Sequence, residues 1–544
     1  MKYIIETLID VKRTFLRPKM PKRQLKQRYG MQPDIHYFEG DMTSIRTYFD
    51  YRYENQLDDF LLDDNTWNDL SGDDIFKIIN HGSSTSGEQY LYYLLRSPAI
   101  SQDEYDKRAK LIEVMENNPD LRFKLHVLFA KLGRRRAANT RDAFHPQPHG
   151  SGRLLFNILL VLAFIGSAIS FLFTTDFFWV FFVLLIFKSV YRELIKSRIE
   201  RDLATVHYSV AMVQTAKKIR KLPFPESEQY LKPLFEALLR LKPILRVGYV
   251  PTKSNLGEAS EFLNMVLMLD LITYELLKNR LGKHYKDIFI IHEYLGRLDS
   301  AIAISSYRKC IQSTSSPRVD FATTSIGFNG IGLVHPLVND AVPNDLQTTE
   351  PVLLTGSNAS GKSTFLKTIA INAIFAQSIC TVLGKEYSAP AFRIYTSIAI
   401  ADDLRAGESY FIAEIKSLKR ITVADTSKQP LLCIIDEVLR GTNTVERIAT
   451  SSELLRHLAN EKTLCLAATH DIELCAMLQG QYRLMHFEET VTDDGEVLFD
   501  YTIKDGPATT RNAIKLLASM GFDEEIVKRS KEKANGYSAE GRWV

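Results

Sequence analysis

The sequence predicts a multidomain fold, in which an α-helical core domain with an inserted transmembrane hairpin is followed by an α/β domain. Three observations predict it. Two apolar stretches lie close together within residues 154–191. Apolar residues recur at helical spacing on both sides of these stretches. Residues 351–370, PVLLTGSNASGKSTFLKTIA, have the pattern of a buried strand, a glycine-rich turn and a helix.

Net charge, cysteine spacing and the N-terminal residues limit which partners, covalent cross-links and targeting signals we expect. The net charge is +3, from 68 basic and 65 acidic side chains, so any surface that attracts nucleic acid or an acidic partner must be local. The five cysteines show no C-x-x-C spacing, which favours reduced cytosolic thiols over a disulfide framework or a zinc site. The N-terminal residues have only short apolar runs and no small-residue cleavage site, so no signal peptide is expected.

Residues 1–60 are predicted to be a basic N-terminal leader. Lysine and arginine dominate residues 12–28, and such a segment suits a membrane surface, a nucleic acid or simply solvent, so no site is assigned there. Residues 61–140 are predicted to form the first part of the helical core, because Thr66 can cap a helix and isoleucines recur at helical spacing within residues 75–79.

Residues 154–191 are predicted to form a transmembrane helical hairpin. Residues 154–173 are 20 residues without a charge, which as a helix span about 30 Å, the thickness of the hydrocarbon core of a bilayer. The second apolar run, residues 177–187, has only 11 residues, and it spans a bilayer only if the side chain of Lys188 snorkels and Val190 and Tyr191 extend the run. Basic residues flank both ends of the hairpin, which places both ends in the cytoplasm.

The expected location is therefore the cell inner (cytoplasmic) membrane, with the other domains in the cytoplasm. The alternatives are an exposed hairpin that dimerises and a hairpin that is buried in a core. Residues 192–315 are predicted to form the second, lever-like part of the helical core. Their Leu, Ile and Met stripes are more typical of core packing than of cofactor contacts.

A site for ATP is predicted in the glycine-rich turn, which matches G-x-x-x-x-G-K-[ST] between a strand and a helix. Gly356 and Gly361 permit a turn in which successive N–H groups point inward, and the helix N-terminus adds partial positive charge. Lys362 would reach the β- and γ-phosphates, and the hydroxyl of Ser363 would bind Mg²⁺. The residues predicted to bind the nucleotide are Gly356, Ser357, Asn358, Ala359, Ser360, Gly361, Lys362, Ser363 and Thr364.

The catalytic residues are predicted at the ends of two later strands. An apolar strand, residues 431–435, is followed by Asp436 and Glu437. One carboxylate there can complete a Mg²⁺ shell and the next can activate water, so we assign Asp436 to the metal and Glu437 to the general base. Another apolar strand precedes His470, which can contact the γ-phosphate or the water. Ser409 comes just before a helix whose N-terminus could face an anion.

Four segments together resemble the MutS-like ATPases of the ABC type, the DNA mismatch repair MutS family. They read GSNASGKST, ADDLRAGESYFIAEI, IIDEVLRGTNT and ATHDIEL. The resemblance implies a MutS-type ATPase domain over residues 316–544, with a C-terminal helical tail. It also implies a homodimer, in which Ser409 of one subunit faces the γ-phosphate held by Lys362 of the other, and DNA as a partner that is bound by charge and shape.

The sequence also departs from that family. Residues 1–60 are too few for the mismatch-reading domain, and Ala341 stands where family members often place an aromatic side chain near adenine. The prediction is a membrane-anchored, Mg²⁺-dependent ATPase that binds DNA, dimerises through its nucleotide domains and acts in mismatch repair or another DNA-handling process. The alternative is a membrane-associated mechanochemical ATPase that acts on protein or lipid partners without DNA.

Overall fold

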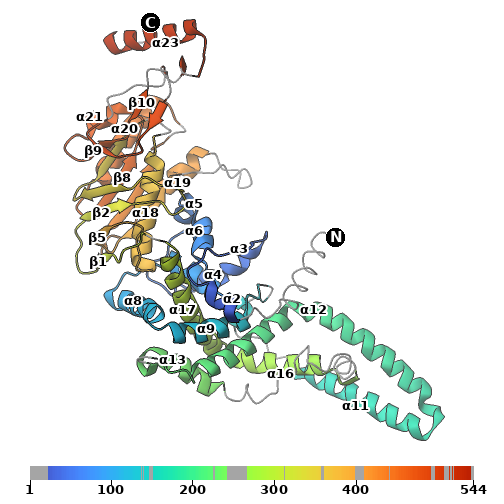
Figure 1. Cartoon of the computed structure of the whole chain (residues 1–544). Helices are drawn as coiled ribbons and strands as arrows, with labels where there is room; N and C mark the ends of the chain where they lie inside the picture. The colour runs from blue at the N-terminus through green and yellow to red at the C-terminus, as the bar shows by residue number, and fades with distance from the viewer. Residues whose placement is uncertain are drawn as a thin grey trace. The chain divides into compact units, whose positions relative to one another are not determined.

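The computed structural model divides the chain into two compact units (Figure 1). Residues 61–140 are predicted above as one part of the helical core, whereas two segments of this stretch, within Asp58–Lys77 and Leu94–Ala109, belong to the second unit. The first unit comprises Met1–Leu57, Ile78–Tyr93 and Lys110–Cys310, and the second comprises Asp58–Lys77, Leu94–Ala109 and Ile311–Val544. The structure describes residues 22–136, 138, 140–145, 151–224, 227–241, 266–311, 313–356, 360–398, 410–439, 442–491, 497–507, 514, 517–518 and 520–540.

Helix α17 (Tyr285–Cys310) is the centre of the first unit, because most of its side chains are buried. It packs against α9 (Pro119–Leu132) and α13 (Ser227–Arg240). Gly296 lets α17 approach the helix that carries Tyr90 closely, since a Cβ at position 296 would lie 2.4 Å from the Cβ of Tyr90. Among the described residues, the further helices before residue 145 that belong wholly or partly to the first unit include α2 (Lys22–Gln27), α3 (Asp41–Ile45), α4 (Thr47–Glu54), α7 (Thr85–Arg96), α8 (Gln102–Asn117) and α10 (Thr140–Ala143).

A buried carboxylate fixes the start of α7. Asp299 of α17 accepts hydrogen bonds from the N–H of Ser83 at 3.1 Å, and from the N–H and hydroxyl of Ser84 at 2.8 and 2.6 Å. These bonds satisfy donors at a helix N-terminus that have no partner within the helix. A side chain at Gly87 would exclude this arrangement, because its Cβ would lie 2.2 Å from a carboxylate oxygen of Asp299.

Two helices form a hairpin in the first unit. Helix α11 (Ser151–Phe173) is joined to α12 (Phe178–Ile219) by the short 3-10 helix η1 (Thr175–Phe177), and α11 packs against α12. Among the described residues, one helical stretch, Gly152–Phe173, is long and apolar enough to cross a membrane by length and composition. Helix α12 continues well beyond residue 191, where the sequence analysis ended the hairpin.

The side chain of Lys188, which the sequence analysis required to snorkel if the second run is to span a bilayer, points into the protein. It is buried, and its ammonium group donates a hydrogen bond to the carbonyl oxygen of Val266 at 2.9 Å. Val266 lies just before α16 (Leu269–Lys283), which packs against both arms of the hairpin.

A six-stranded sheet is the centre of the second unit, with the strand order β12-β9-β4-β8-β7-β6. All neighbouring strands in it are parallel except β12 and β9. Every residue of β4, β7 and β8 is buried, as expected for strands that are covered on both faces. The strands are β4 (Val352–Thr355), β6 (Arg393–Ser397), β7 (Leu431–Asp436), β8 (Thr463–Ala468), β9 (Arg483–His486) and β12 (Lys504–Asp505).

Helix α18 (Lys362–Ser378) lies between this sheet and a second one. It packs against β7 and β8, and also against β1 and β2 of a four-stranded sheet with the order β1-β5-β2-β3. Helix α18 is therefore buried almost all round. The remaining elements are β1 (Arg318–Asp320), β2 (Phe328–Leu333), β3 (Asn344–Thr348), β5 (Glu386–Pro390), β10 (Glu489–Val491), β11 (Val497–Phe499), α5 (Asp64–Asp69), α6 (Gly72–Ile79), α19 (Tyr410–Thr422), α20 (Thr444–Leu458), α21 (Ile472–Met477) and α23 (Glu524–Glu540).

Helix α5 is held against the edge strand β6, which is why Asp58–Lys77 belongs to the second unit. Asp69 accepts hydrogen bonds from the hydroxyl of Thr396 at 2.6 Å and from the N–H of Ile398 at 3.0 Å. Arg420 of α19 forms an ion pair with Asp63, the residue that caps α5.

Lowering the pH should destabilise the first unit. Burial lowers the pKa of His81, His126 and His207 to about 4, and that of His292 to about 3. The unfolded chain therefore takes up protons first as the pH falls below about 6.5, and each such group removes roughly 1.4 kcal/mol of stability per pH unit down to its folded pKa. Burial raises the pKa of Asp299 to about 6 and also raises the pKa of Glu275, which has the opposite effect, but these are two groups against four.

Chemical denaturation at about pH 7.5 and about pH 5 measures this effect. The substitution His292→Phe removes one buried titrating group and should reduce the pH dependence. His457→Phe, at an exposed position of the second unit, is the matched control and should leave the pH dependence unchanged. Equal stability of the parent chain at both pH values would contradict the prediction.

Candidate active site

The parallel strands β4, β8 and β7 bring the predicted site residues to one edge of the six-stranded sheet. The register pairs Leu354 with Ala468, and Ala468 with Asp436, so the three strands end at the same level. Residues that follow the carboxyl ends of parallel strands share one edge of the sheet, which is where ligands bind in folds of this kind. The glycine-rich loop follows β4, Glu437 follows β7, and His470 comes two residues after β8.

The glycine-rich loop needs glycine at both of its ends. Gly356 has a φ of 136°, and a Cβ there would lie 2.6 Å from the carbonyl oxygen of Phe487. Gly361 has a φ of 104° and is the N-cap residue of α18. Both values lie in the region of backbone space that glycine adopts without strain. Ser360 is buried, Thr364 is exposed, and the predicted ligands at positions 357–359 lie outside the described residues.

The side chain of Lys362 reaches back to the first glycine of the loop. Its side chain is almost fully buried, and its ammonium group donates a hydrogen bond to the carbonyl oxygen of Gly356 at 2.7 Å. The positive charge is therefore held beside Gly356, directly after β4. A buried ammonium group is stabilised by an anionic ligand, so this position suits a phosphate group.

Ser363 and Asp436 come together although 73 residues separate them. The hydroxyl of Ser363 donates a short hydrogen bond to a carboxylate oxygen of Asp436, which is the last residue of β7. A hydroxyl and a carboxylate side by side are oxygen ligands of the kind that Mg²⁺ prefers. These are the two residues that the sequence predicts as metal ligands, and that role stays a prediction.

Glu437 and His470 form a second pair at the same edge of the sheet. Nε2 of His470 lies 2.7 Å from Oε1 of Glu437, and both side chains are partly exposed. Glu437 has a φ of 58°, a left-handed conformation that is costly for a residue with a side chain. Its N–H donates a hydrogen bond to the carbonyl oxygen of Ala468 at 2.9 Å, so the strained residue is fixed to the sheet.

The structure adds two features that the sequence analysis missed. Arg447 of α20 forms a two-point ion pair with Asp471, the residue after His470, with nitrogen–oxygen distances of 2.6 and 2.9 Å. The hydrogen bond to Asp471 raises the pKa of Arg447. The second feature is the ring of Tyr501, which lies beside Gly361: a Cβ added to this glycine would be 3.3 Å from a ring atom of Tyr501. No local sequence pattern signals either contact, because each joins segments far apart in the chain.

The predicted residue Ser409 lies outside the described residues, and α19 begins at Tyr410. The contact that was predicted between subunits through this residue therefore stays a prediction.

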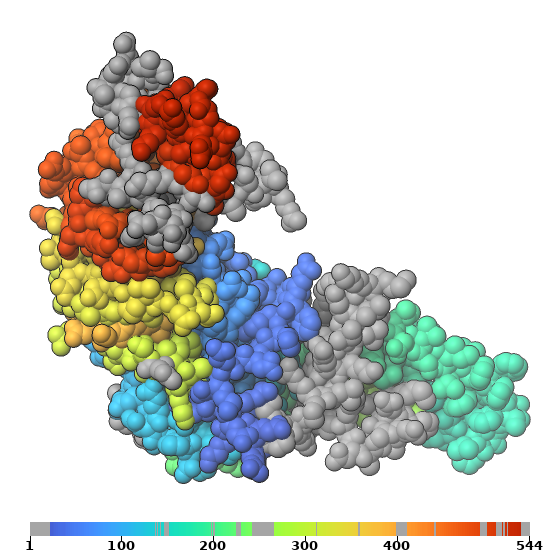
Figure 2. All heavy atoms as spheres, turned by 45° about the horizontal axis from the view of Figure 1, so that its top comes forward, coloured from blue at the N-terminus to red at the C-terminus, as the bar shows by residue number. Residues whose placement is uncertain are grey.

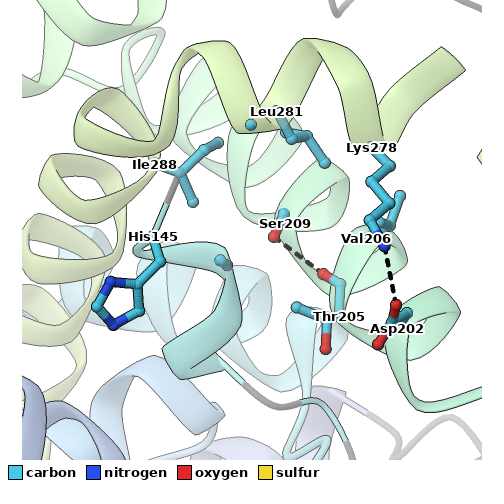
Figure 3. Close-up of a pocket in the computed structure, with 10 residues that line it drawn as sticks. His145, Asp202, Thr205, Val206, Ser209, Lys278, Leu281 and Ile288 are labelled. Atoms are coloured by element: carbon cyan, nitrogen blue, oxygen red, sulfur yellow. Dashed lines mark hydrogen bonds and ion pairs between the residues drawn. The ribbon is translucent and has the colours of Figure 1, made fainter. Parts of the chain in front are cut away.

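A separate small pocket of about 50 Å³ lies in the first unit, between α12, α16 and α17 (Figure 3). Its lining is mostly apolar, with an ion pair of 3.0 Å between Lys278 and Asp202 at one side. The hydroxyl of Ser209 donates to the backbone of its own helix, at the carbonyl oxygen of Thr205. Lys278, Asp202 and Ser209 thus bond within the protein, and we assign no catalytic role to this pocket.

Comparison with known proteins supports a MutS relationship for the C-terminal part of the chain. Residues 352–537 match the family model for MutS domain V. The chain is 32% identical over 210 residues to the DNA mismatch repair protein MutS of Thermus thermophilus, covering 38% of this chain and 26% of that protein. It is 32% identical over 241 residues to the protein of that name from Natronomonas pharaonis, covering 42% and 28% of the two chains.

A third relative, the DNA mismatch repair protein MutS of Fervidobacterium nodosum, is 28% identical over 277 residues, which cover 50% of this chain and 33% of that protein. The matches to these three relatives thus span between 26% and 33% of the relatives' own length. The candidate active site lies within the matched part, because the residues that form it all fall in residues 352–537. The C-terminal part of this chain is therefore similar to domain V of the MutS proteins.

Proposed function

We propose that the second unit binds ATP together with Mg²⁺ and hydrolyses the bond between its β- and γ-phosphates. The observation that carries this proposal is the hydrogen bond between Ser363 and Asp436 next to the buried ammonium group of Lys362. A positive charge, a helix N-terminus and two oxygen ligands then face the same edge of the sheet. This is the arrangement that a metal-bound triphosphate requires.

The described residues fit both groups. Ser363 and Asp436 would hold Mg²⁺ through their oxygen atoms, and the bound ion would neutralise charge on the phosphates. Lys362 would exchange its bond to the carbonyl oxygen of Gly356 for a bond to phosphate, which is stronger because both partners are charged. The partly exposed ring of Tyr501 beside Gly361 offers a surface on which an adenine base could stack.

Glu437 is proposed as the general base. Its carboxylate is partly exposed, so water can reach it, and the backbone bond to Ala468 holds it at the edge of the sheet. His470 bonds to the same carboxylate and thus orients it. The ion pair between Arg447 and Asp471 supports the segment that carries His470.

For the whole chain we propose a membrane-anchored ATPase of the MutS type that binds DNA and acts as a homodimer. The relatives are named as DNA mismatch repair proteins, which favours DNA as the partner. Many large apolar side chains of α11 and α12 are exposed, which favours a membrane anchor at the cell inner membrane, with the second unit and the rest of the first unit in the cytoplasm.

A second candidate function is a membrane-associated mechanochemical ATPase that acts on protein or lipid partners without DNA. The exposed apolar hairpin fits both candidates, and the observation that favours this one is the limited length of the match to the MutS relatives. Both candidates share the proposed ATPase site, so a measurement of DNA binding separates them.

The substitution Lys362→Ala should weaken ATP binding by at least about tenfold, because it removes a charged hydrogen-bond donor from the phosphate site. Equilibrium binding of a fluorescent ATP analogue with Mg²⁺ measures this. Lys428→Ala is the control, since this lysine is well exposed and forms an ion pair with Asp59 away from the sheet edge. Unchanged binding by the Lys362 variant would rule out the proposed site.

The substitution Glu437→Gln should lower the rate of ATP hydrolysis by roughly 10²- to 10⁴-fold, because it removes the general base while it keeps the size of the side chain. ATP binding should be retained, and size-exclusion chromatography with ATP should show a trapped dimer. Phosphate release under single-turnover conditions measures the chemical step. Hydrolysis at the parental rate would show that Glu437 is not the base.

DNA binding should depend on ATP and fall steeply with salt concentration, because backbone phosphates are bound by charge. Fluorescence anisotropy with the detergent-solubilised full chain measures this on homoduplex, mismatched and branched DNA. Failure to bind any of these DNAs at low salt, with ATP hydrolysis intact, would favour the second candidate function.

A further inference from the structure

On α12 the exposed apolar side chains extend beyond the apolar run of residues 177–187 in the sequence. At 1.5 Å per residue, the exposed stripe on α11 from Leu155 to Phe173 is about 27 Å long, and the stripe on α12 from Phe178 to Leu194 is about 24 Å long. Figure 2 shows the tip of the hairpin, in teal, with no other described segment over the face in view. The exposed large apolar side chains on α12 are Phe178, Trp179, Val180, Phe182, Val183, Ile186, Phe187, Val190 and Leu194, and the charged side chain of Glu193, next to Leu194, is also exposed.

Lys188 interrupts the apolar run of the sequence but not this surface. The side chain of Lys188 is 0% exposed, and its ammonium group bonds to the carbonyl oxygen of Val266 and lies 3.7 Å from the centre of the Phe164 ring. The carbonyl dipole and the face of the ring both stabilise a cation. The charge is therefore held within the protein rather than on the exposed face.

Arg192 lies one helical turn later, and its charge is also directed into the protein, here by an ion pair. A guanidinium nitrogen of Arg192 lies 2.6 Å from a carboxylate oxygen of Asp270, and 16% and 7% of these two side chains are exposed. An ion pair that is largely shielded from water needs such close geometry to offset the loss of hydration. Next to it, the hydroxyl of Tyr191 donates to the side-chain oxygen of Asn157 at 3.1 Å.

Both partners of these basic side chains lie at the start of α16. Val266 and Asp270 flank its first residue, Leu269, and α16 packs against α11 and α12 at the base of the hairpin (Figure 1). Without these partners, Lys188 and Arg192 would have to face lipid or turn the exposed face of α12 polar. A charge that faces lipid is costly unless it is paired.

We propose that the start of α16 is a third component of the membrane anchor, which holds Lys188 and Arg192 inward and thereby extends the lipid-facing surface of α12 to Leu194. This inference rests on the proposed membrane association. The occupant of the surface is a lipid bilayer, because the two stripes approach the thickness of its hydrocarbon core, about 30 Å. Trp179 at the tip is of the residue type that favours the membrane interface.

Fluorescent probes on single introduced cysteines test the inference in the full chain bound to phospholipid vesicles. Ile186→Cys lies before Lys188, and Val190→Cys and Leu194→Cys lie beyond it. The vesicles carry a lipid with a quencher within the hydrocarbon core. Val445→Cys, at an exposed position in the second unit, is the control for water exposure, and the labelled parent chain gives the background from the native cysteines.

The inference predicts that the probes at positions 190 and 194 are quenched to a degree comparable with the probe at 186, while the probe at 445 is not. If 186 is quenched but 190 and 194 are not, the inference is wrong and the membrane association stands. If none is quenched and the chain self-associates without lipid, the surface is covered by a second copy and the proposed membrane association fails as well.

A charge substitution tests the role of α16 directly. Asp270→Asn leaves Arg192 without its ionic partner and should reduce the quenching at position 194 by at least about twofold, with the probe at 186 still quenched. Asp202→Asn is the matched control, because Asp202 also joins α12 to α16, through Lys278, but lies beyond the apolar stripe. Equal quenching at 194 in the Asp270 variant and the parent would overturn the assignment of α16 to the anchor.

Discussion

The parallel hydrogen-bond ladder that joins β4, β8 and β7 is the constraint on which the rest of the second unit depends. Its register sets Leu354, Ala468 and Asp436 side by side. A slip of one residue would turn Asp436 to the opposite face of the sheet and separate it from Ser363. The buried apolar side chains of these strands hold the register, because a slip would move all of them, so the core fixes the site geometry.

The same ladder holds backbone conformations that are unfavourable by themselves. Glu437 and Leu439 both have a φ of 58°, which costs on the order of 1 kcal/mol for each residue. The N–H of Glu437 bonds to the end of β8, and its carboxylate contacts His470 just beyond that strand. The strain therefore has a geometric result: the proposed base is directed toward the edge where the loop and the metal ligands lie.

The core of the site could be predicted from the sequence because its parts are local patterns. The glycine loop, the two carboxylates and His470 each stand directly beside an apolar strand, and the strand order then brings them together. Tyr501 and Arg447 could not be predicted in this way, since only the folded chain places them near Gly361 and Asp471. For the same reason the sequence did not indicate that α5 joins the sheet, or that Lys188 turns toward Val266 instead of toward water.

The most direct test of the central claim is a crystal structure of the full chain with Mg²⁺ and a non-hydrolysable ATP analogue. We predict that the phosphates occupy the loop between Gly356 and Gly361, with the metal ion bound to the Ser363 hydroxyl beside Asp436. The ammonium group of Lys362 should leave the carbonyl oxygen of Gly356 and contact a phosphate oxygen. A nucleotide bound elsewhere, or a Lys362 that keeps its bond to Gly356 with the analogue in place, would contradict this account.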